Sequence, residues 1–192
     1  MKQILDYVVH LDHYIPRDIC DKIIESLSQN NFVKSSRIDH RGNSYDKDDK
    51  MHYLANSLSN NKIIDSYIPK LLYKYHLRNR NSLIPWTSLS WNGIDFLRYT
   101  KEQRFTRHVD HVNTIFDGER RGIPILTIIG WLNDDFEGGE FHLCDKKIDS
   151  KTGDVIMFPS NFVYPHEVKP ILSGVRYSWS HGYGDYIICK DF

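Results

Sequence analysis

The sequence has few cysteines and no long apolar run. Cys20, Cys144 and Cys189 are far apart, odd in number and without a CxxC pair, which argues against both a disulfide framework and a zinc knuckle. No segment is apolar for long enough to span a bilayer. Acidic and histidine residues flank the short apolar run near the start, so it does not match a signal-peptide core. We therefore expect a cytoplasmic protein without a membrane partner.

An excess of one charge is also absent. The 25 lysine and arginine residues balance 25 aspartate and glutamate residues at a pI near 7.1, so no global field favours nucleic acid as a partner. With 192 residues, of which 40% are hydrophobic and 13% aromatic, the chain can build one substantial core but not a second domain of ordinary size. We expect one domain over residues 1–192, of unknown oligomeric state.

Apolar residues recur at helical spacing in two stretches of the first 84 residues. The first runs from Pro16 to Gln29, and the second from about Asn60 to Arg80, where Pro69 should kink or divide it. Between them, Lys34 to His52 is polar, charged and without periodicity, which is typical of a long loop. These patterns predict a helical leader over about residues 1–84.

The composition changes from about residue 85 onward to short aromatic and β-branched runs separated by Gly, Asn, Asp and Pro. The predicted strands lie near residues 88–100, 105–110, 123–132, 139–144, 154–158, 163–169 and 175–183. Strands that follow a helical leader predict an α+β, mainly β fold, in which an antiparallel barrel or jelly roll over about residues 85–192 is packed against N-terminal helices.

The motif RHVDH offers two metal ligands on one strand. His108 and Asp110 are two residues apart, so in extended backbone their side chains leave the same face. An HxD triplet is common by chance, but His166 lies in a later predicted strand that can return beside the first. Two imidazoles and one carboxylate form a facial triad, which suits Fe(II) with open coordination positions. The same ligands can hold a catalytic zinc ion, so the triad alone leaves a hydrolase open.

Arg176 favours the oxygenase over the hydrolase. It follows His166 by ten residues, with turn-forming residues such as Gly174 between them. If the two segments pair as a hairpin centred near Ile171, positions 166 and 176 become cross-strand neighbours on one face. A guanidinium can bind a carboxylate through two hydrogen bonds, so Arg176 can hold the distal carboxylate of 2-oxoglutarate. A zinc hydrolase would leave this arginine without a task, and the sequence offers no comparable general base.

Several ordered motifs resemble the catalytic half of prolyl 4-hydroxylases and related 2-oxoglutarate oxygenases. They are the HxD triplet, FEGGEF, TGDVIMFPSNFVYPHEVKP and GVRYSW, over about residues 86–182. The resemblance implies a double-stranded β-helix, a distorted jelly roll, with helices packed outside. It implies Fe(II) held by His108, Asp110 and His166, 2-oxoglutarate anchored by Arg176, and dioxygen as the oxidant. Ascorbate is a further candidate cofactor.

The resemblance also assigns residues around the cosubstrate. Tyr99, nine residues before His108, matches a pocket tyrosine, and Thr127 matches a hydroxyl residue that often lines the same pocket. Trp131 stands where some relatives have a tyrosine that helps to hold the distal carboxylate. Its indole N–H, or another donor, would have to provide that hydrogen bond to the distal carboxylate here.

The implied activity is Fe(II)- and 2-oxoglutarate-dependent hydroxylation of a peptidyl residue, with release of succinate and CO2. A prolyl residue in an extended, proline-rich peptide or protein is the leading candidate substrate, and the Lys34 to His52 segment is its expected cover. Two alternatives stay open. One is a hydroxylase of a free amino acid or another small molecule, and the other is a non-catalytic jelly-roll binding module.

Overall fold

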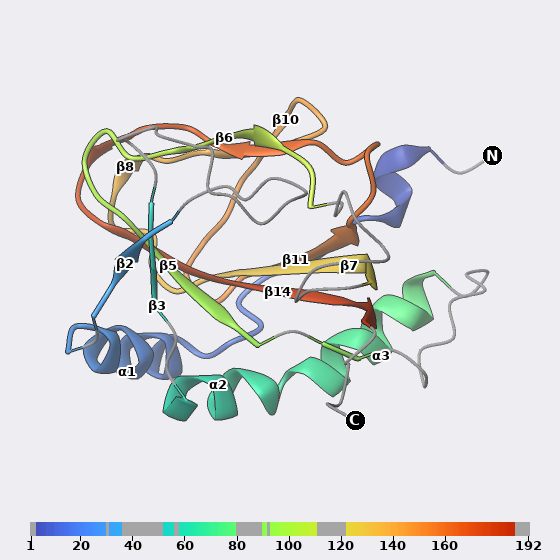
Figure 1. Ribbon diagram of the computed structural model, residues 1–192, viewed down its shortest axis with the longest axis horizontal. Helices are drawn as coiled ribbons and strands as arrows, with labels where there is room; N and C mark the ends of the chain where they lie inside the picture. The colour runs from blue at the N-terminus through green and yellow to red at the C-terminus, as the bar shows by residue number, and fades with distance from the viewer. Residues whose placement is uncertain are drawn as a thin grey trace, which may run out of the picture.

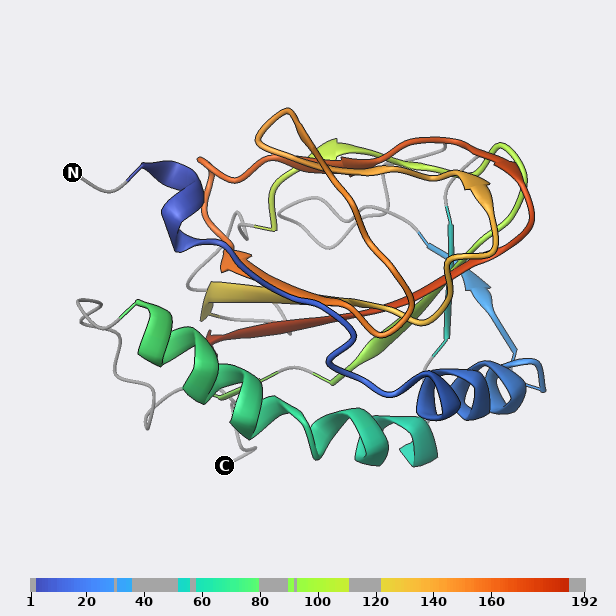
Figure 2. The same cartoon turned by 180° about the vertical axis from the view of Figure 1, so that it is seen from behind.

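Two antiparallel sheets face each other, and the helices α1 (Arg17–Leu27), α2 (Leu58–Asp65) and α3 (Ile68–Arg78) cover the outer side of the larger one (Figures 1 and 2). The computed structural model describes residues 3–29, 31–35, 52–55, 58–79, 90–91, 93–110 and 122–186. This arrangement confirms the predicted mainly β fold with N-terminal helices, and it is the double-stranded β-helix that the motifs implied. None of the described helices is long and apolar enough to cross a membrane.

The larger sheet has the order β1-β11-β7-β14-β5-β3-β2, and β4 pairs with β14 beside this path. Its strands are β1 (Val9–Leu11), β2 (Val33–Lys34), β3 (Tyr53–Ala55), β4 (Ser90–Trp91), β5 (Asp95–Tyr99), β7 (Gly122–Trp131), β11 (Val155–Pro159) and β14 (Arg176–Tyr186). The long strands β7 and β14 pair with each other at its centre.

The smaller sheet has the order β10-β9-β12-β6, and a separate pair joins β13 to β8. These strands are β6 (Phe105–His108), β8 (Glu137–Gly138), β9 (Phe141–Leu143), β10 (Lys146–Ile148), β12 (His166–Val168) and β13 (Ile171–Ser173). In the register between β12 and β6, His166 lies opposite His108. Two residues that are 58 positions apart in the chain therefore meet at one end of the smaller sheet.

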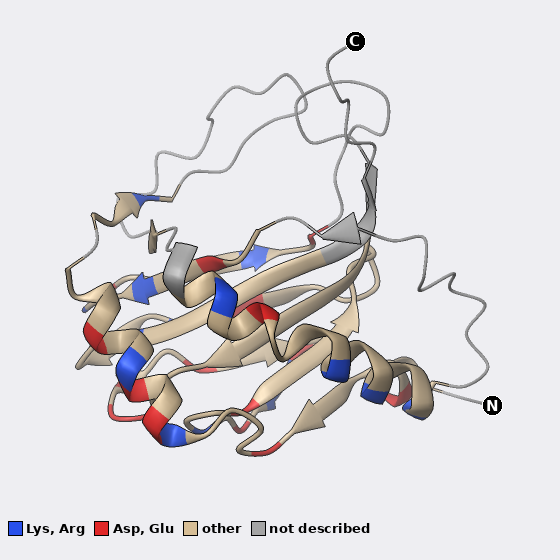
Figure 3. Cartoon of the chain, turned by 90° about the horizontal axis from the view of Figure 1, so that it is seen from below, with Lys and Arg blue, Asp and Glu red and all other residues tan. Residues whose placement is uncertain are grey.

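The helices are η1 (Ile4–Tyr7), α1 (Arg17–Leu27), α2 (Leu58–Asp65) and α3 (Ile68–Arg78). Pro16 precedes α1, where a missing N–H is tolerated, and Pro69 occupies the first turn of α3. The predicted division of the second helical stretch is thus confirmed. Acidic and basic residues are interspersed over the helical side (Figure 3).

The larger sheet has a core on each face. On the helical side, Trp179 packs in one cluster with buried residues of α1 and α3, such as Ile23 and Leu71. Between the two sheets, Phe141 and Phe158 belong to a second cluster. Because side chains alternate along a strand, Trp179 on β14 faces the helices whereas Arg176 and Ser178 line a pocket on the other face.

Two expectations were wrong in detail. The leader is not purely helical, because β1, β2 and β3 join the larger sheet. His166 and Arg176 do not pair in a hairpin either: β12 pairs with β6 and β9, whereas β14 pairs with β5 and β7. The reason is topological, since the chain changes sheets between β12 and β14 and Ile171 pairs with β8. Residues 36–51, most of the predicted loop, lie outside the described residues.

Candidate active site

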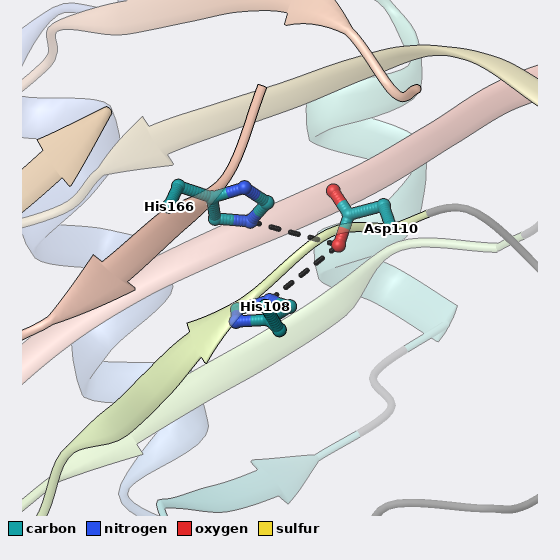
Figure 4. A group of neighbouring side chains, drawn as sticks. All are labelled: His108, Asp110 and His166. Atoms are coloured by element: carbon teal, nitrogen blue, oxygen red, sulfur yellow. Dashed lines mark ion pairs between the residues drawn. The ribbon is translucent and has the colours of Figure 1, made fainter. Parts of the chain in front are cut away.

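Three candidate metal ligands converge where β6 and β12 meet. His108 ends β6, Asp110 follows two residues later, and His166 begins β12. Asp110 Oδ1 lies 3.5 Å from Nε2 of His108 and 3.6 Å from Nε2 of His166. Figure 4 shows both imidazoles directed at this carboxylate. The three ligand atoms all lie within 4.8 Å of one another.

The other ring nitrogens explain how the two imidazoles are oriented. Nδ1 of His108 lies 2.9 Å from the carbonyl oxygen of Thr106, and Nδ1 of His166 lies 3.1 Å from that of Tyr164. A carbonyl oxygen can only accept a hydrogen bond, so Nδ1 must carry the proton in each ring. In the neutral imidazole, Nε2 then presents its lone pair toward Asp110, as a metal ligand requires.

The protonation states also suit a cation. Burial would raise the pKa of Asp110, but His166, His108 and a hydrogen bond from Thr127 outweigh it and hold the pKa well below its ordinary value. Burial, together with His108, lowers the pKa of His166 against the opposing effect of Asp110. The site thus combines an ionised carboxylate with an imidazole that resists protonation, which is the state in which both bind metals.

This donor set fits a divalent metal ion. Neighbouring ligands of an octahedral ion with bonds of about 2.1 Å are about 3 Å apart, close to the two observed nitrogen–oxygen distances. Two imidazoles and one carboxylate occupy three of six octahedral positions, which leaves room for exogenous ligands. The three side chains could therefore hold an ion that also binds a small chelating molecule.

A pocket of about 280 Å³ extends from these three residues between the sheets. Its apolar wall includes Leu97, Ile129, Phe141 and Val168. The remaining lining residues are Gly93, Asp95, Tyr99, Phe105, His108, Asp110, Pro124, Thr127, Ser160, His166, Arg176, Ser178, Ser180, His181 and Gly182. The pocket therefore connects the candidate ligands from the smaller sheet with Arg176 from the larger one.

Arg176 is a buried cation on the wall of this pocket. Its side chain is 1% exposed, its Nη1 donates to Ser178 Oγ at 3.0 Å, and its guanidinium carbon lies 4.9 Å from the Tyr99 ring centre. Burial lowers the pKa of Arg176 against the opposing effect of Tyr99. No carboxylate among the described residues pairs with it, and its Nε has no hydrogen-bond partner there. A buried guanidinium without a counter-ion, facing a cavity, is a site for an anion.

Tyr99 and Trp131 both lie near this guanidinium, but only one lines the pocket. Tyr99 is the cross-strand neighbour of Arg176 and a lining residue, and burial raises its pKa to about 12 although Arg176 opposes the shift. Its hydroxyl therefore stays protonated and can donate. The Trp131 ring lies 5.9 Å from the guanidinium carbon, but its side chain is not part of the lining. Its indole N–H finds no partner among the described residues.

Thr127 lines the pocket and also contacts a candidate metal ligand, because its hydroxyl donates to Asp110 Oδ2 at 2.6 Å. Two other residues of this region were given no part by the sequence analysis, although Ser160 lies within the motif TGDVIMFPSNFVYPHEVKP. Ser160 lies 2.7 Å from the Thr127 hydroxyl. The buried His52 ring stacks on Tyr99 and packs against Phe105, each at 4.7 Å between ring centres. Only the folded chain brings Ser160 and His52 to the site.

Comparison with known proteins identifies the family. The model of the 2OG-Fe(II) oxygenase superfamily matches residues 94–181, a span that contains every predicted site residue. Residues 94–181 of this chain belong to the 2OG-Fe(II) oxygenase superfamily. A search of curated protein sequences gave no match for this oxygenase.

Solved structures agree with the oxygenase fold at low sequence identity. The viral collagen prolyl hydroxylase of Paramecium Bursaria Chlorella virus-1, in its 2OG complex, is 16% identical with a TM-score of 0.66, over 93% of this chain and 96% of that one. A Trichoplax adhaerens prolyl hydroxylase with a hypoxia inducible factor peptide fragment is 18% identical with a TM-score of 0.69, over 94% and 84%. HygX from Streptomyces hygroscopicus with nickel, 2-oxoglutarate and hygromycin B is 15% identical with a TM-score of 0.63, over 95% and 85%. At these identities the likeness concerns the fold.

Proposed function

We propose that this oxygenase hydroxylates a peptidyl residue, with proline in an extended segment as its target, in an Fe(II)- and 2-oxoglutarate-dependent reaction. The observation that carries the proposal is the shared pocket. A three-donor metal cluster and a buried arginine without a carboxylate partner both face it. Superfamily membership implies the same two cofactors.

In this proposal, Nε2 of His108, Oδ1 of Asp110 and Nε2 of His166 hold the iron. When bound, iron and 2-oxoglutarate supply an oxidation in which dioxygen is split, CO2 and succinate are released, and a C–H bond becomes C–OH. Arg176 binds the distal carboxylate of 2-oxoglutarate, and the protonated Tyr99 hydroxyl offers a further donor beside it. Trp131 is proposed to support the Arg176 guanidinium from behind the pocket wall.

The apolar wall has a separate part in the chemistry. Leu97, Ile129, Phe141 and Val168 line the space between the candidate iron ligands and the arginine. Side chains of this kind exclude water from the reacting centre, which protects a reactive oxidant from side reactions. A hydrolase would instead need water at the metal and a general base beside it, and Arg176 would have no substrate group to bind.

The choice of a peptide over a small molecule rests on the structural neighbours. Three of them are described as prolyl hydroxylases, one of which was solved with a peptide fragment. HygX, however, was solved with hygromycin B at a comparable TM-score, so hydroxylation of a small molecule is a second candidate function. The metal triad and the arginine are compatible with both.

A substrate comparison separates these functions. The enzyme would receive Fe(II) and 2-oxoglutarate, with and without ascorbate, together with proline-containing peptides, lysine-containing peptides or free proline. Product would be read as a mass gain of one oxygen atom, and succinate would be quantified in parallel. We expect oxidised proline in the peptides and none with the Asp110→Ala enzyme. Preference for free proline would favour the small-molecule function. Absence of iron-dependent succinate would instead favour a non-catalytic binding module.

A further inference from the structure

We propose that Ser160 is a positioning residue, which acts through Thr127 to keep Asp110 presenting a single oxygen to the metal. The inference rests on the proposed function, because it assigns the metal to this cluster. Ser160 and Thr127 are both buried, with 2% and 5% of their surfaces exposed, so neither hydroxyl can rely on bulk water for its hydrogen bonds.

The direction of the hydrogen bonds follows from the chemistry of the three groups. Thr127 Oγ1 lies 2.6 Å from Asp110 Oδ2 and 2.7 Å from Ser160 Oγ. An ionised carboxylate can only accept, so the single hydroxyl proton of Thr127 is committed to Asp110. Thr127 must then accept from Ser160, whose own proton points toward Thr127. The result is a one-way relay from Ser160 through Thr127 to Asp110.

The backbone fixes the two donors but not the acceptor. Thr127 lies in β7, opposite Phe158 of β11, and Ser160 directly follows β11 with its N–H donating to the Ile125 carbonyl oxygen at 3.0 Å. Asp110 lies beyond the end of β6, where no strand pairing orients its side chain. The relay therefore attaches this carboxylate to the larger sheet, whereas His108 and His166 come from the smaller one.

The relay determines which oxygen faces the histidines. With Oδ2 occupied by Thr127, Oδ1 is the oxygen that lies 3.5 Å and 3.6 Å from the two Nε2 atoms. A carboxylate can bind a metal ion through one oxygen or through both. Holding Oδ2 on Thr127 favours the one-oxygen mode, which keeps one more coordination position open for exogenous ligands. Outer hydrogen bonds of this kind tune metal sites generally.

The test is Co(II) binding to the whole protein, measured by calorimetry and by the visible Co(II) absorption, which depends on coordination number. Thr127→Val should weaken binding about tenfold, and Ser160→Ala should weaken it about fivefold. Both should alter the Co(II) spectrum. Because Ser160 acts only through Thr127, the double variant should bind no more weakly than Thr127→Val alone.

Controls separate this role from general damage to the fold. Thr152→Val removes a matched bond, from a buried threonine hydroxyl to Asp134 at 2.8 Å, and should leave Co(II) affinity and spectrum unchanged. Thr127→Ser keeps the donor and should recover most of the affinity, even where Thr127→Val folds poorly. Additive losses in the double variant, or wild-type binding and spectrum in Ser160→Ala, overturn the relay. No Co(II) binding by the wild-type protein overturns the proposed metal centre and the relay with it.

Discussion

Replacing Arg176 with methionine should abolish most of the response to 2-oxoglutarate without weakening the fold. In the protein alone, this guanidinium is 1% exposed, bonded to Ser178 and without a carboxylate partner among the described residues. A buried cation of this kind costs free energy, and an apolar side chain of similar length removes the cost. We therefore expect the ligand-free Arg176→Met protein to unfold at the wild-type temperature or above it.

The loss of ligand binding can be given a magnitude. Removing one partner of a buried charge pair costs at least about 2 kcal/mol, or about thirtyfold in affinity. At a 2-oxoglutarate concentration of about 100 times Kd, the wild-type protein gains about 2.7 kcal/mol of stability. The variant at the same concentration should gain only about 0.9 kcal/mol. For a domain of this size, these values correspond to Tm increases of about 5–10 °C and about 2–3 °C.

Thermal unfolding with Mn(II) in place of iron, with and without 2-oxoglutarate, measures both quantities. Arg98→Met is the matched control, because Arg98 lies on the neighbouring strand β5 with its guanidinium over the Phe32 ring at 4.2 Å, away from the pocket lining. It should keep the full increase, and Arg176→Lys should be intermediate because it keeps the charge but not the paired donors. If 2-oxoglutarate raised the Tm of Arg176→Met as much as that of the wild-type protein, Arg176 would not be the anchor of the distal carboxylate.

Three further predictions follow from buried groups. Burial lowers the pKa of His52 to about 3, so between about pH 6 and pH 4 only the unfolded chain takes up a proton at this residue. The free energy of unfolding should therefore decrease by about 1.4 kcal/mol for each unit by which the pH is lowered. Urea unfolding of His52→Phe should lack this contribution, and the same dependence of stability on pH in both proteins would contradict it. Tyr99→Phe should raise the 2-oxoglutarate Kd about threefold to tenfold in calorimetry, and an unchanged Kd would remove Tyr99 from the site. A Cβ at Gly130 would collide with the Trp179 indole, so Gly130→Ala should cost about 1–3 kcal/mol by denaturant unfolding, whereas Gly93→Ala, with open space around its Cβ, should cost little.

Local patterns predicted the parts of the site that lie close together in the chain. His108 and Asp110 were predicted from a two-residue spacing on one strand, although β6 ends at His108 and Asp110 lies just beyond it. The helix after Pro16 and the division near Pro69 followed from the restricted backbone of proline. These features depend on neighbours in the chain, which the sequence displays directly.

Features that depend on strand pairing were predicted less well. Arg176 does face the same pocket as His166, but the predicted hairpin was wrong because the two residues reach it from opposite sheets. Spacing along the chain cannot show which sheet a strand joins. The parts of Ser160 and His52 were missed for the same reason, because each contacts the site only through pairing of segments that are distant in the chain. Ser160 lies within the motif TGDVIMFPSNFVYPHEVKP, but nothing in that stretch shows that its hydroxyl contacts Thr127.

Succinate formation from 2-oxoglutarate is the most direct test of the central claim that His108, Asp110 and His166 hold a catalytic iron. The wild-type protein would be compared with the alanine variant of each ligand, and with His142→Ala as a control on the neighbouring strand β9, outside the pocket lining. We predict succinate that requires added Fe(II) in the wild-type and His142→Ala proteins, and little from any ligand variant. Near-normal, iron-dependent succinate from two of the three ligand variants would contradict the assignment.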